Sequence, residues 1–268
     1  MEKPWPQYWV KNVNAVKYSN LPRKAEFVII GEKYSDILDD PLKKLGITPI
    51  FVPDNPYVDN RLSGHADLSV LHTGGEGLWL APYLKCTGFS RALEKMGFQI
   101  FYPDIVQSAT YPGDAQLNLC ICGDKLIYNQ RTAAQEIKKY LTNICGLEAI
   151  NSRQGYTKCS VCIVDRGAII TADKGIAEAS KKVGMDVLLI SAGGVELEGF
   201  DCGFIGGAAF KLSREVLAFT GHLDKHPDRD AILSFLDSRG VRPTYLTDRP
   251  LFDIGSGLPI IETDGSLL

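Results

Sequence analysis

Residues 174–190 have the sequence KGIAEASKKVGMDVLLI, and they contain the pattern that decides the fold. An amphipathic helix pattern ends at Gly184, shortly after Lys181 and Lys182, and an apolar run follows over residues 185–190. Glycine is favoured after the last helical turn because it adopts the left-handed conformation at little cost, and lysine there complements the negative end of the helix dipole. The stretch therefore predicts a helix, a stop at glycine and a strand.

The same pattern occurs five times along the chain. The glycines that follow a helix pattern are Gly46, Gly97, Gly146, Gly184 and Gly240. The strands that we expect after them cover residues 47–52, 98–102, 147–150, 185–190 and 241–246. Recurrence at intervals of roughly 40–55 residues is the sequence signature of a repeat architecture.

Each repeat contains two further strand patterns. The first begins near residues 65–70, 113–117, 157–161, 200–204 and 252–256, and four of these five segments have aspartate at the matched position. The matched residues are Asp67, Asp114, Asp201 and Asp253, with Lys158 in the third repeat. A second apolar run follows in most repeats, for example over residues 125–128 and 168–171. The predicted unit is therefore three strands and one helix.

The two ends of the chain complete the count of units. The fifth unit reaches Leu268 without a helix, whereas the chain has an unpaired strand pattern over Ala25–Gly31 and a helix pattern after it. We expect the N-terminal strand to complete the fifth unit, because an open ring would leave edge strands exposed. The fold class is then α/β (α+β), a five-fold pseudo-symmetric propeller. Residues 1–268 form a single domain in this prediction, with residues 1–24 as an N-terminal extension.

Composition excludes several classes of protein. The chain has 268 residues, of which 45% are hydrophobic, so it can bury a large core. A formal net charge of −3 argues against nucleic-acid or membrane partners, which need a clustered basic face. No apolar run reaches the roughly 18 residues of a membrane span. Residues 1–13 have no apolar secretory core, so we expect a cytoplasmic protein.

The seven cysteines lie mostly in apolar runs, which speaks against a disulfide framework. Cys159 and Cys162 form a CxxC pair, and Cys120 and Cys122 share one face of a predicted strand. Such thiols can bind zinc, but structural zinc pairs normally lie on turns, and a cysteine in mid-strand behaves as a small buried hydrophobe. We therefore expect no metal and no cofactor.

Five units of small sheet plus helix, the matched aspartates and Gly113-Asp114 together resemble the pentein, or guanidino-group-modifying enzyme, superfamily, most closely its uncharacterised bacterial members. The resemblance covers residues 25–268. It implies a five-bladed barrel with a central axial pocket. The superfamily includes arginine and agmatine deiminases, dimethylargininase, amidinotransferases and a non-catalytic ribosome anti-association factor. In its enzymes, carboxylates hold the guanidinium, a histidine relays protons and a cysteine of the last unit attacks the guanidino carbon.

The resemblance implies that the residues at the matched positions line the axial pocket and bind a ligand. These residues are Asp67, Asp114, Lys158, Asp201 and Asp253. Four converging carboxylates would repel one another unless a cation or Lys158 lay among them. Asp114 resembles the substrate-gripping aspartate of the deiminases; the alternative is that it closes its own turn by bonding a backbone amide.

The catalytic cysteine of the family is missing from the last unit, because no cysteine lies beyond Cys202. Ser256 is one substitute, although its two flanking glycines also suit a plain turn residue, and a serine needs a base to become nucleophilic. Cys202 is the other substitute. It follows Asp201 directly, so on a strand it would face the opposite side, and its alternative role is a core thiol.

Two histidines are candidates for acid–base work. His65 and Asp67 are two residues apart, so on a strand they would share a face, as in a carboxylate-oriented imidazole. The alternative for His65 is an exposed place at a strand edge. His222-Leu223-Asp224 resembles the His-Leu-Asp of arginine deiminases, but it leads into a helix, where aspartate commonly caps amides.

We therefore expect the axial pocket to bind a small cationic, guanidinium-like metabolite or a protein partner without catalysis. The alternative is a C–N hydrolase or deiminase that uses Cys202 or Ser256 with His65 or His222. Under either hypothesis, the partners that we expect for the protein are a small cation and a second copy of the chain in a homo-oligomer. We expect neither nucleic acid nor a membrane as a partner.

Overall fold

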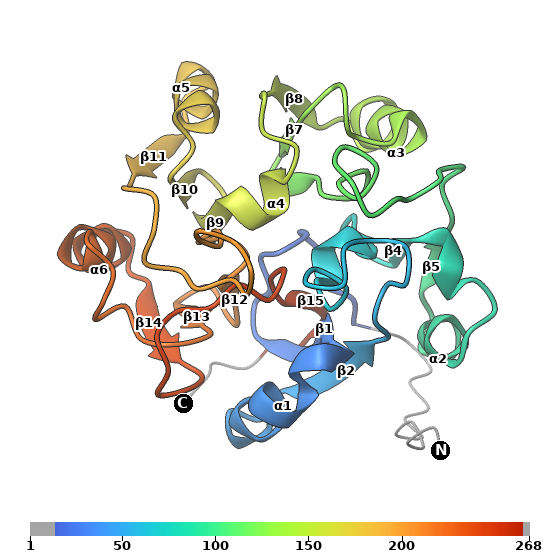
Figure 1. Ribbon diagram of the computed structural model, residues 1–268, viewed down its shortest axis with the longest axis horizontal. Coiled ribbons are helices and arrows are strands. Elements are labelled where there is room, and N and C mark those ends of the chain that lie inside the picture. Colours follow the sequence, from blue (N-terminus) through green and yellow to red (C-terminus); the bar gives the residue numbers. More distant parts are fainter. Residues whose placement is uncertain (1–13, 265–268) are drawn as a thin grey trace.

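The computed structural model describes residues 14–264, which form five small sheets arranged around a central axis (Figure 1). Each sheet has three strands. In every sheet the middle strand pairs antiparallel with an inner strand and parallel with an outer strand. The helix between the middle and outer strands makes the crossover that a parallel pair requires. The five-fold pseudo-symmetry that the sequence predicts is confirmed.

The elements of each unit follow in the order inner strand, middle strand, helix and outer strand. They are β15 (Leu258–Glu262), β1 (Ala25–Gly31), α1 (Ser35–Lys44) and β2 (Thr48–Val52); β3 (Val70–His72), β4 (Gly77–Leu80), α2 (Gly88–Lys95) and β5 (Gln99–Phe101); β6 (Cys120–Cys122), β7 (Lys125–Tyr128), α3 (Gln135–Lys139) and β8 (Glu148–Asn151); β9 (Val161–Asp165), β10 (Ala168–Thr171), α5 (Lys174–Lys182) and β11 (Asp186–Leu189); β12 (Ala209–Lys211), β13 (Val216–Phe219), α6 (Arg229–Ser238) and β14 (Arg242–Tyr245). Short helices lie between them: η1 (Glu32–Tyr34), η2 (Ala66–Leu68), η3 (Pro82–Leu84), η4 (Tyr140–Ile144) and α4 (Thr157–Ser160).

The last strand closes the ring. β15 pairs antiparallel with β1, with Ala25 opposite Glu262 and Ile29 opposite Leu258. The chain entering the ring adds to this closure, because the N–H of Val16 donates to the carbonyl of Ile260 over 2.9 Å. The N-terminal strand therefore completes the unit that the C-terminus leaves open, as predicted.

Local rules explain how the repeated helices start and stop. The side chain of Asp173 accepts a hydrogen bond of 2.8 Å from the N–H of Ile176 and so caps the start of α5. Gly184 has a φ of +80° and ends the helix. Ile176 and Ala177 form the buried face of α5, and the helices stand on the outer rim of the ring (Figure 1).

The hydrophobic core is itself a ring, because each of its five main clusters joins two neighbouring sheets. Successive residues of a middle strand enter different clusters. In β10, Ile169 packs in the cluster that contains Ile127 of β7, whereas Ile170 packs in the cluster that contains Leu217 of β13. Side chains alternate between the faces of a strand, so every sheet is packed on both sides by its neighbours.

Two segments near the axis differ from the sequence prediction. Residues 66–68 and 157–160 form the short helices η2 and α4, although both belong to expected strand patterns. The hydroxyl of Thr157 donates to the carbonyls of Asn118 and Ile127, so contacts with the preceding unit set the backbone of α4. Cys159 consequently lies on a helix, and the expectation that it sits in mid-strand is wrong.

The third predicted helix also ends differently. Ile137 and Leu141 are buried as expected, but Ile144 is 75% exposed. Residues 140–144 continue α3 as a π-helix, whose wider turn rotates Ile144 away from the face that Ile137 and Leu141 share.

The predicted N-terminal extension is packed against the ring where the structure describes it. Ala15 bridges to Ile261 and Lys24 bridges to Ser213, whereas residues 1–13 lie outside the described part of the chain. Among residues 14–264, no helix combines the length and the apolar character that crossing a membrane requires.

Ring closure predicts a large effect of Ile260→Ala in β15. Ile260 is fully buried between the sheets of β1 and β4, so removing its side chain should lower the free energy of unfolding by about 2–5 kcal/mol in urea denaturation. Val106→Ala is the matched control, because Val106 is 86% exposed. Equal stability of both variants would show that the β15–β1 closure contributes little.

Candidate functional site

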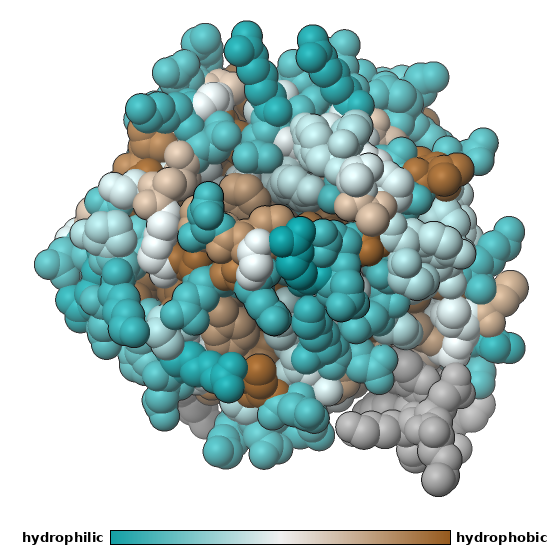
Figure 2. Space-filling view, in the orientation of Figure 1, coloured by the Kyte–Doolittle hydropathy of each residue, from teal (hydrophilic) through white to brown (hydrophobic). Residues whose placement is uncertain are grey.

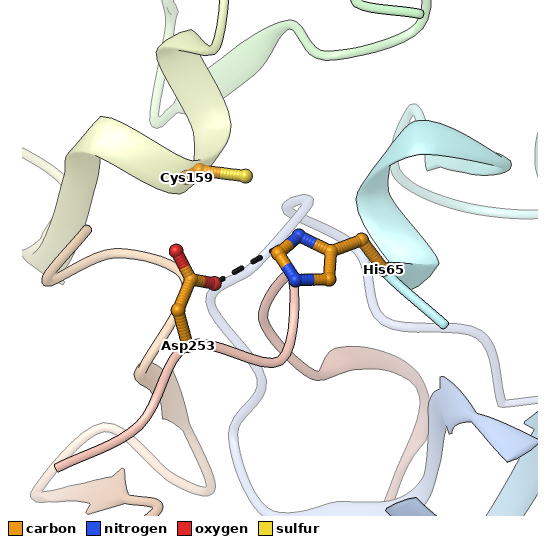
Figure 3. A group of neighbouring side chains, drawn as sticks. All are labelled: His65, Cys159 and Asp253. Atoms are coloured by element: carbon orange, nitrogen blue, oxygen red, sulfur yellow. Dashed lines mark ion pairs between the residues drawn. The ribbon is translucent and has the colours of Figure 1, made fainter. Parts of the chain in front are cut away.

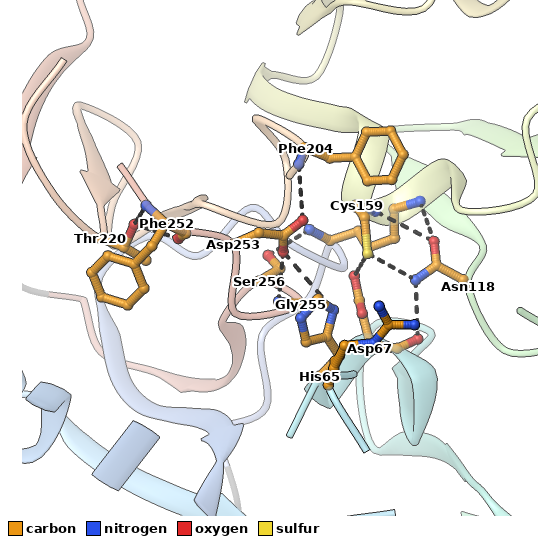
Figure 4. A network of polar contacts seen from close by, with 12 residues as sticks. His65, Asp67, Asn118, Cys159, Phe204, Thr220, Phe252, Asp253, Gly255 and Ser256 are labelled. Atoms are coloured by element: carbon orange, nitrogen blue, oxygen red, sulfur yellow. Dashed lines mark hydrogen bonds and ion pairs between the residues drawn. The ribbon is translucent and has the colours of Figure 1, made fainter. Parts of the chain in front are cut away.

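Polar side chains from different units meet near the axis (Figure 4). We call seven of them the axial cluster: His65, Asp67, Asn118, Lys158, Cys159, Asp253 and Ser256. Each lies in the segment just before an inner strand, and none is more than 4% exposed. Because successive units place the same segment at the axis, closing the ring brings together residues that are far apart in the sequence.

Cys159 is held by residues of two other units. Asn118 Oδ1 accepts hydrogen bonds from the N–H groups of Lys158 and Cys159, at 2.8 and 3.3 Å. Asn118 Nδ2 lies 3.3 Å from Cys159 Sγ, and the thiol donates to Asp67 Oδ2 over 2.9 Å (Figure 4). The thiol is therefore fixed between an amide donor and a carboxylate acceptor.

Burial has the largest effect on the ionisation of the acidic groups in the cluster. Burial raises the pKa of Asp67 to about 6, and Asp253 adds to the rise, although His65 and Lys158 oppose it. Burial also raises the pKa of Cys159 well above its ordinary value, and Asp67 and Asp253 raise it further. Asp67 Oδ1 has no hydrogen-bond partner among the described residues. Ionised Asp67 is thus stabilised only in part.

Asp253 is oriented by backbone amides. Its carboxylate accepts from the N–H of Phe204 and from the N–H of Gly255, both at 2.9 Å. His65 Nδ1 lies 3.9 Å from Asp253 Oδ1 (Figure 3). A Cβ at Gly207 would collide with the Asp253 carboxylate, so glycine is required for this close approach. One donor atom each of His65, Cys159 and Asp253 lies within 4.8 Å of the others.

Ser256 and Lys158 form a buried pair across the axis. Lys158 Nζ donates to Ser256 Oγ over 2.6 Å, and Ser256 Oγ lies 3.1 Å from the carbonyl of Ala209, to which it donates. Ser256 has a φ of +63°, which is uncommon for a residue with a side chain. Its hydroxyl thus anchors the Lys158 amine, and its proton is directed at a backbone carbonyl.

Asp114 lies beside the axial cluster. It is 2% exposed, and its Oδ2 accepts a hydrogen bond of 2.6 Å from the hydroxyl of Tyr156. Asp114 Oδ1 has no partner within residues 14–264, and burial raises the pKa of this carboxyl group. The side chain does more than close its own turn, because Tyr156 belongs to the next unit.

The other candidate residues lie outside the cluster. Asp201 is exposed and Cys202 is half-buried, and both line a surface pocket of about 650 Å³ that Asp253 also lines. His222 stacks on Tyr245 of β14 with ring centroids 4.4 Å apart, and His222 Nε2 lies 3.6 Å from Asp248 Oδ1.

Hydrophilic side chains surround apolar residues near the middle of the face seen in Figure 2.

Asn118 is the cluster residue that the sequence candidates did not include, and Cys159 was considered there only as a zinc ligand and not as a residue of the axial pocket. Cys159 directly follows Lys158 at the matched position, and that adjacency is the sequence signal that could have identified it. Cys120, Cys122 and Cys162, which the sequence offered as zinc ligands with Cys159, pack in hydrophobic clusters. His65 is 2% exposed, so it is not an exposed residue at a strand edge.

Asp67→Asn should change how stability depends on pH. The pKa of Asp67 rises from 3.8 to about 6 in the folded chain, so folding takes up a proton between these values. The free energy of unfolding that Asp67 contributes therefore falls as pH rises from about 4 to about 6. Urea denaturation across this range should show that the variant lacks this fall. Asp237→Asn, on the exposed side of α6, is the control, and its free energy of unfolding should depend on pH as that of the wild type does. The same pH dependence in Asp67→Asn would refute the raised pKa of Asp67.

Solved structures with the same fold include two amidinotransferases and DDAH. An amidinotransferase of the saxitoxin pathway from Microseira wollei has 11% sequence identity and a TM-score of 0.56, with 95% of this chain and 99% of that chain covered. An inosamine-phosphate amidinotransferase from Streptomyces griseus has 12% identity and a TM-score of 0.55, with 96% and 99% covered. DDAH from Pseudomonas aeruginosa, complexed with citrulline, has 9% identity and a TM-score of 0.52, with 87% and 96% covered.

These likenesses show that the fold is the pentein fold, as the resemblance implied. No curated protein matches the chain. A family model described as "Family of unknown function (DUF6873)" matches residues 29–258. The protein is therefore a pentein-fold member of the DUF6873 family.

Proposed function

We propose that the axial cluster binds a small cation of the guanidinium type. The observation that carries this proposal is the unpartnered Oδ1 of Asp67, a side chain that is 1% exposed. A buried acceptor without a donor costs about 1–3 kcal/mol, and more when it is charged. A cationic N–H donor that reached Asp67 would remove this cost.

The surrounding groups favour a guanidinium over a simple ammonium. Asp114 Oδ1 is a second buried acceptor without a partner, so two carboxylates offer free acceptor positions. A guanidinium presents several N–H donors in one plane and pairs well with carboxylates and aromatic faces. The rings of Tyr156 and Phe204, with centroids 6.2 Å apart, provide aromatic surface next to Asp114. An ammonium group is not planar, so it would match the carboxylate oxygens and the aromatic rings less well.

A surface pocket supports access for such a ligand. The pocket of about 650 Å³ has Asp253 in its lining, together with Tyr34 and Phe252. Its volume lies in the range of roughly 300–1,000 Å³ that is typical of small-molecule sites. The amidinotransferases with the same fold have names that refer to amidino groups, which agrees with a guanidinium-like ligand.

A second candidate function is thiol-dependent chemistry on a C–N bond. It is favoured by the 2.9 Å hydrogen bond from Cys159 to Asp67, whose pKa of about 6 suits a general base at neutral pH. A base within hydrogen-bond reach of a thiol is the arrangement of an activated nucleophile. In this case Cys159 takes the role for which the sequence offered Cys202 or Ser256.

Ligand binding is tested by thermal shift and isothermal titration on chelator-treated protein. Arginine, agmatine and methylated arginines are compared with polyamines, which have no guanidinium group. A ligand at one hundred times its dissociation constant stabilises the fold by about 2.7 kcal/mol. We expect at least one guanidinium compound to reach such a shift in the wild type and to lose it in Asp67→Asn and Asp114→Asn.

Asp237→Asn is the control, because it removes an exposed carboxylate from α6 at the rim. It should bind like the wild type. Absence of binding by every guanidinium compound would overturn the proposal and favour the protein partner as occupant. Equal binding by the Asp67 and Asp114 variants would place the ligand elsewhere.

Alkylation of Cys159 separates binding from thiol chemistry. Cys86 and Cys145 are exposed, so they are first replaced by serine. In this background, iodoacetamide should modify Cys159 slowly at pH 7, because burial raises the pKa of the thiol. For the thiol-dependent function, a bound guanidinium compound should accelerate modification by favouring the thiolate. If mass spectrometry shows that the bound guanidinium compound only slows the modification of Cys159, the result would support binding without catalysis.

A further inference from the structure

We propose that His65, Cys159 and Asp253 form a binding site for a divalent, thiol-preferring metal ion of the Zn²⁺ type. The three side chains come from three different units and point toward one another across the axis (Figure 3). This inference goes beyond guanidinium binding. It differs from the zinc site that the sequence suggested, which used the CxxC pair.

The distances suit a tetrahedral site. One donor atom of each residue lies within 4.8 Å of the other two. Zinc binds sulfur at about 2.3 Å and nitrogen or oxygen at about 2.0–2.2 Å, so the donor atoms of a filled site lie roughly 3.3–3.8 Å apart. Donor atoms that are 4.8 Å apart would therefore move closer together by about 1.5 Å at most when the ion binds.

Asp67 lies beside one of the three ligands. Asp67 Oδ2 lies 2.9 Å from Cys159 Sγ, so its carboxylate is next to the sulfur. Asp67 Oδ1 and His65 Nε2 are buried and have no hydrogen-bond partner among residues 14–264. Buried polar atoms without a partner are a second observation, besides the distances between the three donor atoms, that favours a bound ion here.

The donor types select the metal. A thiolate and an imidazole favour Zn²⁺ and similar transition metals, whereas Mg²⁺ and Ca²⁺ prefer oxygen donors. A divalent ion would also offset the negative charge of the buried Asp67 and Asp253 carboxylates. Lys158 competes little for this position, because its Nζ is bonded to Ser256 Oγ at 2.6 Å.

Neighbouring groups hold two ligands in position before any metal binds. The N–H groups of Phe204 and Gly255 fix Asp253, and Asn118 fixes the backbone and the thiol of Cys159. Hydrogen bonds of this kind orient metal ligands and strengthen binding. The site thus has the supporting contacts that a chance cluster of donors lacks.

The test uses full-length protein treated with chelator, with Cys86 and Cys145 replaced by serine so that exposed thiols do not bind metal. Zn²⁺ uptake is measured by calorimetry, and Co²⁺ is added as an optical probe. We expect one Zn²⁺ per chain and, with Co²⁺, the charge-transfer absorption of a cobalt–thiolate bond. Cys159→Ser should abolish that absorption and weaken Zn²⁺ binding by more than about tenfold.

His65→Gln tests whether the imidazole binds the ion. Cys202→Ser is the matched control for Cys159→Ser, because Cys202 lies outside the cluster. His65→Gln should weaken Zn²⁺ binding with unchanged circular dichroism, and the control should bind like its parent. Absence of stoichiometric uptake, or uptake that Cys159→Ser leaves unchanged, would overturn the proposal. Guanidinium binding is measured on metal-free protein, so the two experiments are separate. Failure of guanidinium compounds to bind would leave the Zn²⁺ result standing, and failure of Zn²⁺ to bind would leave the guanidinium result standing.

Discussion

The antiparallel pairing of β15 with β1 is the interaction on which the rest of the structure depends. Without it, the first unit would lack its inner strand, and the core cluster that contains Ile29 would lose Leu258, Ile260 and Ile261. Each sheet is packed by both neighbours, so an opening at one point exposes apolar surface on two units. Closure therefore joins five small sheets, none of which can bury its apolar faces alone, into one packed ring.

Closure also creates the axial cluster. The segments that precede the inner strands carry the polar side chains of the cluster, and these segments meet at the axis of the closed ring. The same geometry removes His65, Asp67 and Asp253 from water, which makes ionised carboxylates costly there. Backbone amides and Asn118 offset this cost only in part. We propose that the remaining negative charge favours a bound cation at the axis, either an organic cation or a metal ion.

Features controlled by local rules could be predicted from the sequence. The five helix-ending glycines all have positive φ, and the strands β7 and β10 have the predicted bounds. The axial segments could not be predicted so well, because contacts with other units decide their backbone. Asn118 sets α4, and no pattern within residues 157–161 indicates it. Of the matched residues, Asp67, Lys158 and Asp253 belong to the axial cluster and Asp114 lies beside it, whereas Asp201 is exposed. Cys159 follows Lys158 directly, but the strand expected there would have turned the two side chains to opposite faces.

The ionisation of Asp67 reports most directly on the central claim that the axis is a cation site. Its side-chain carboxyl can be followed by carbon-detected NMR in labelled protein, with and without the tightest-binding cation. The account predicts that the pKa of Asp67 is about 6 in the free protein and falls when the cation binds. A pKa near the usual value in the free protein, or no change on adding any cation, would contradict it.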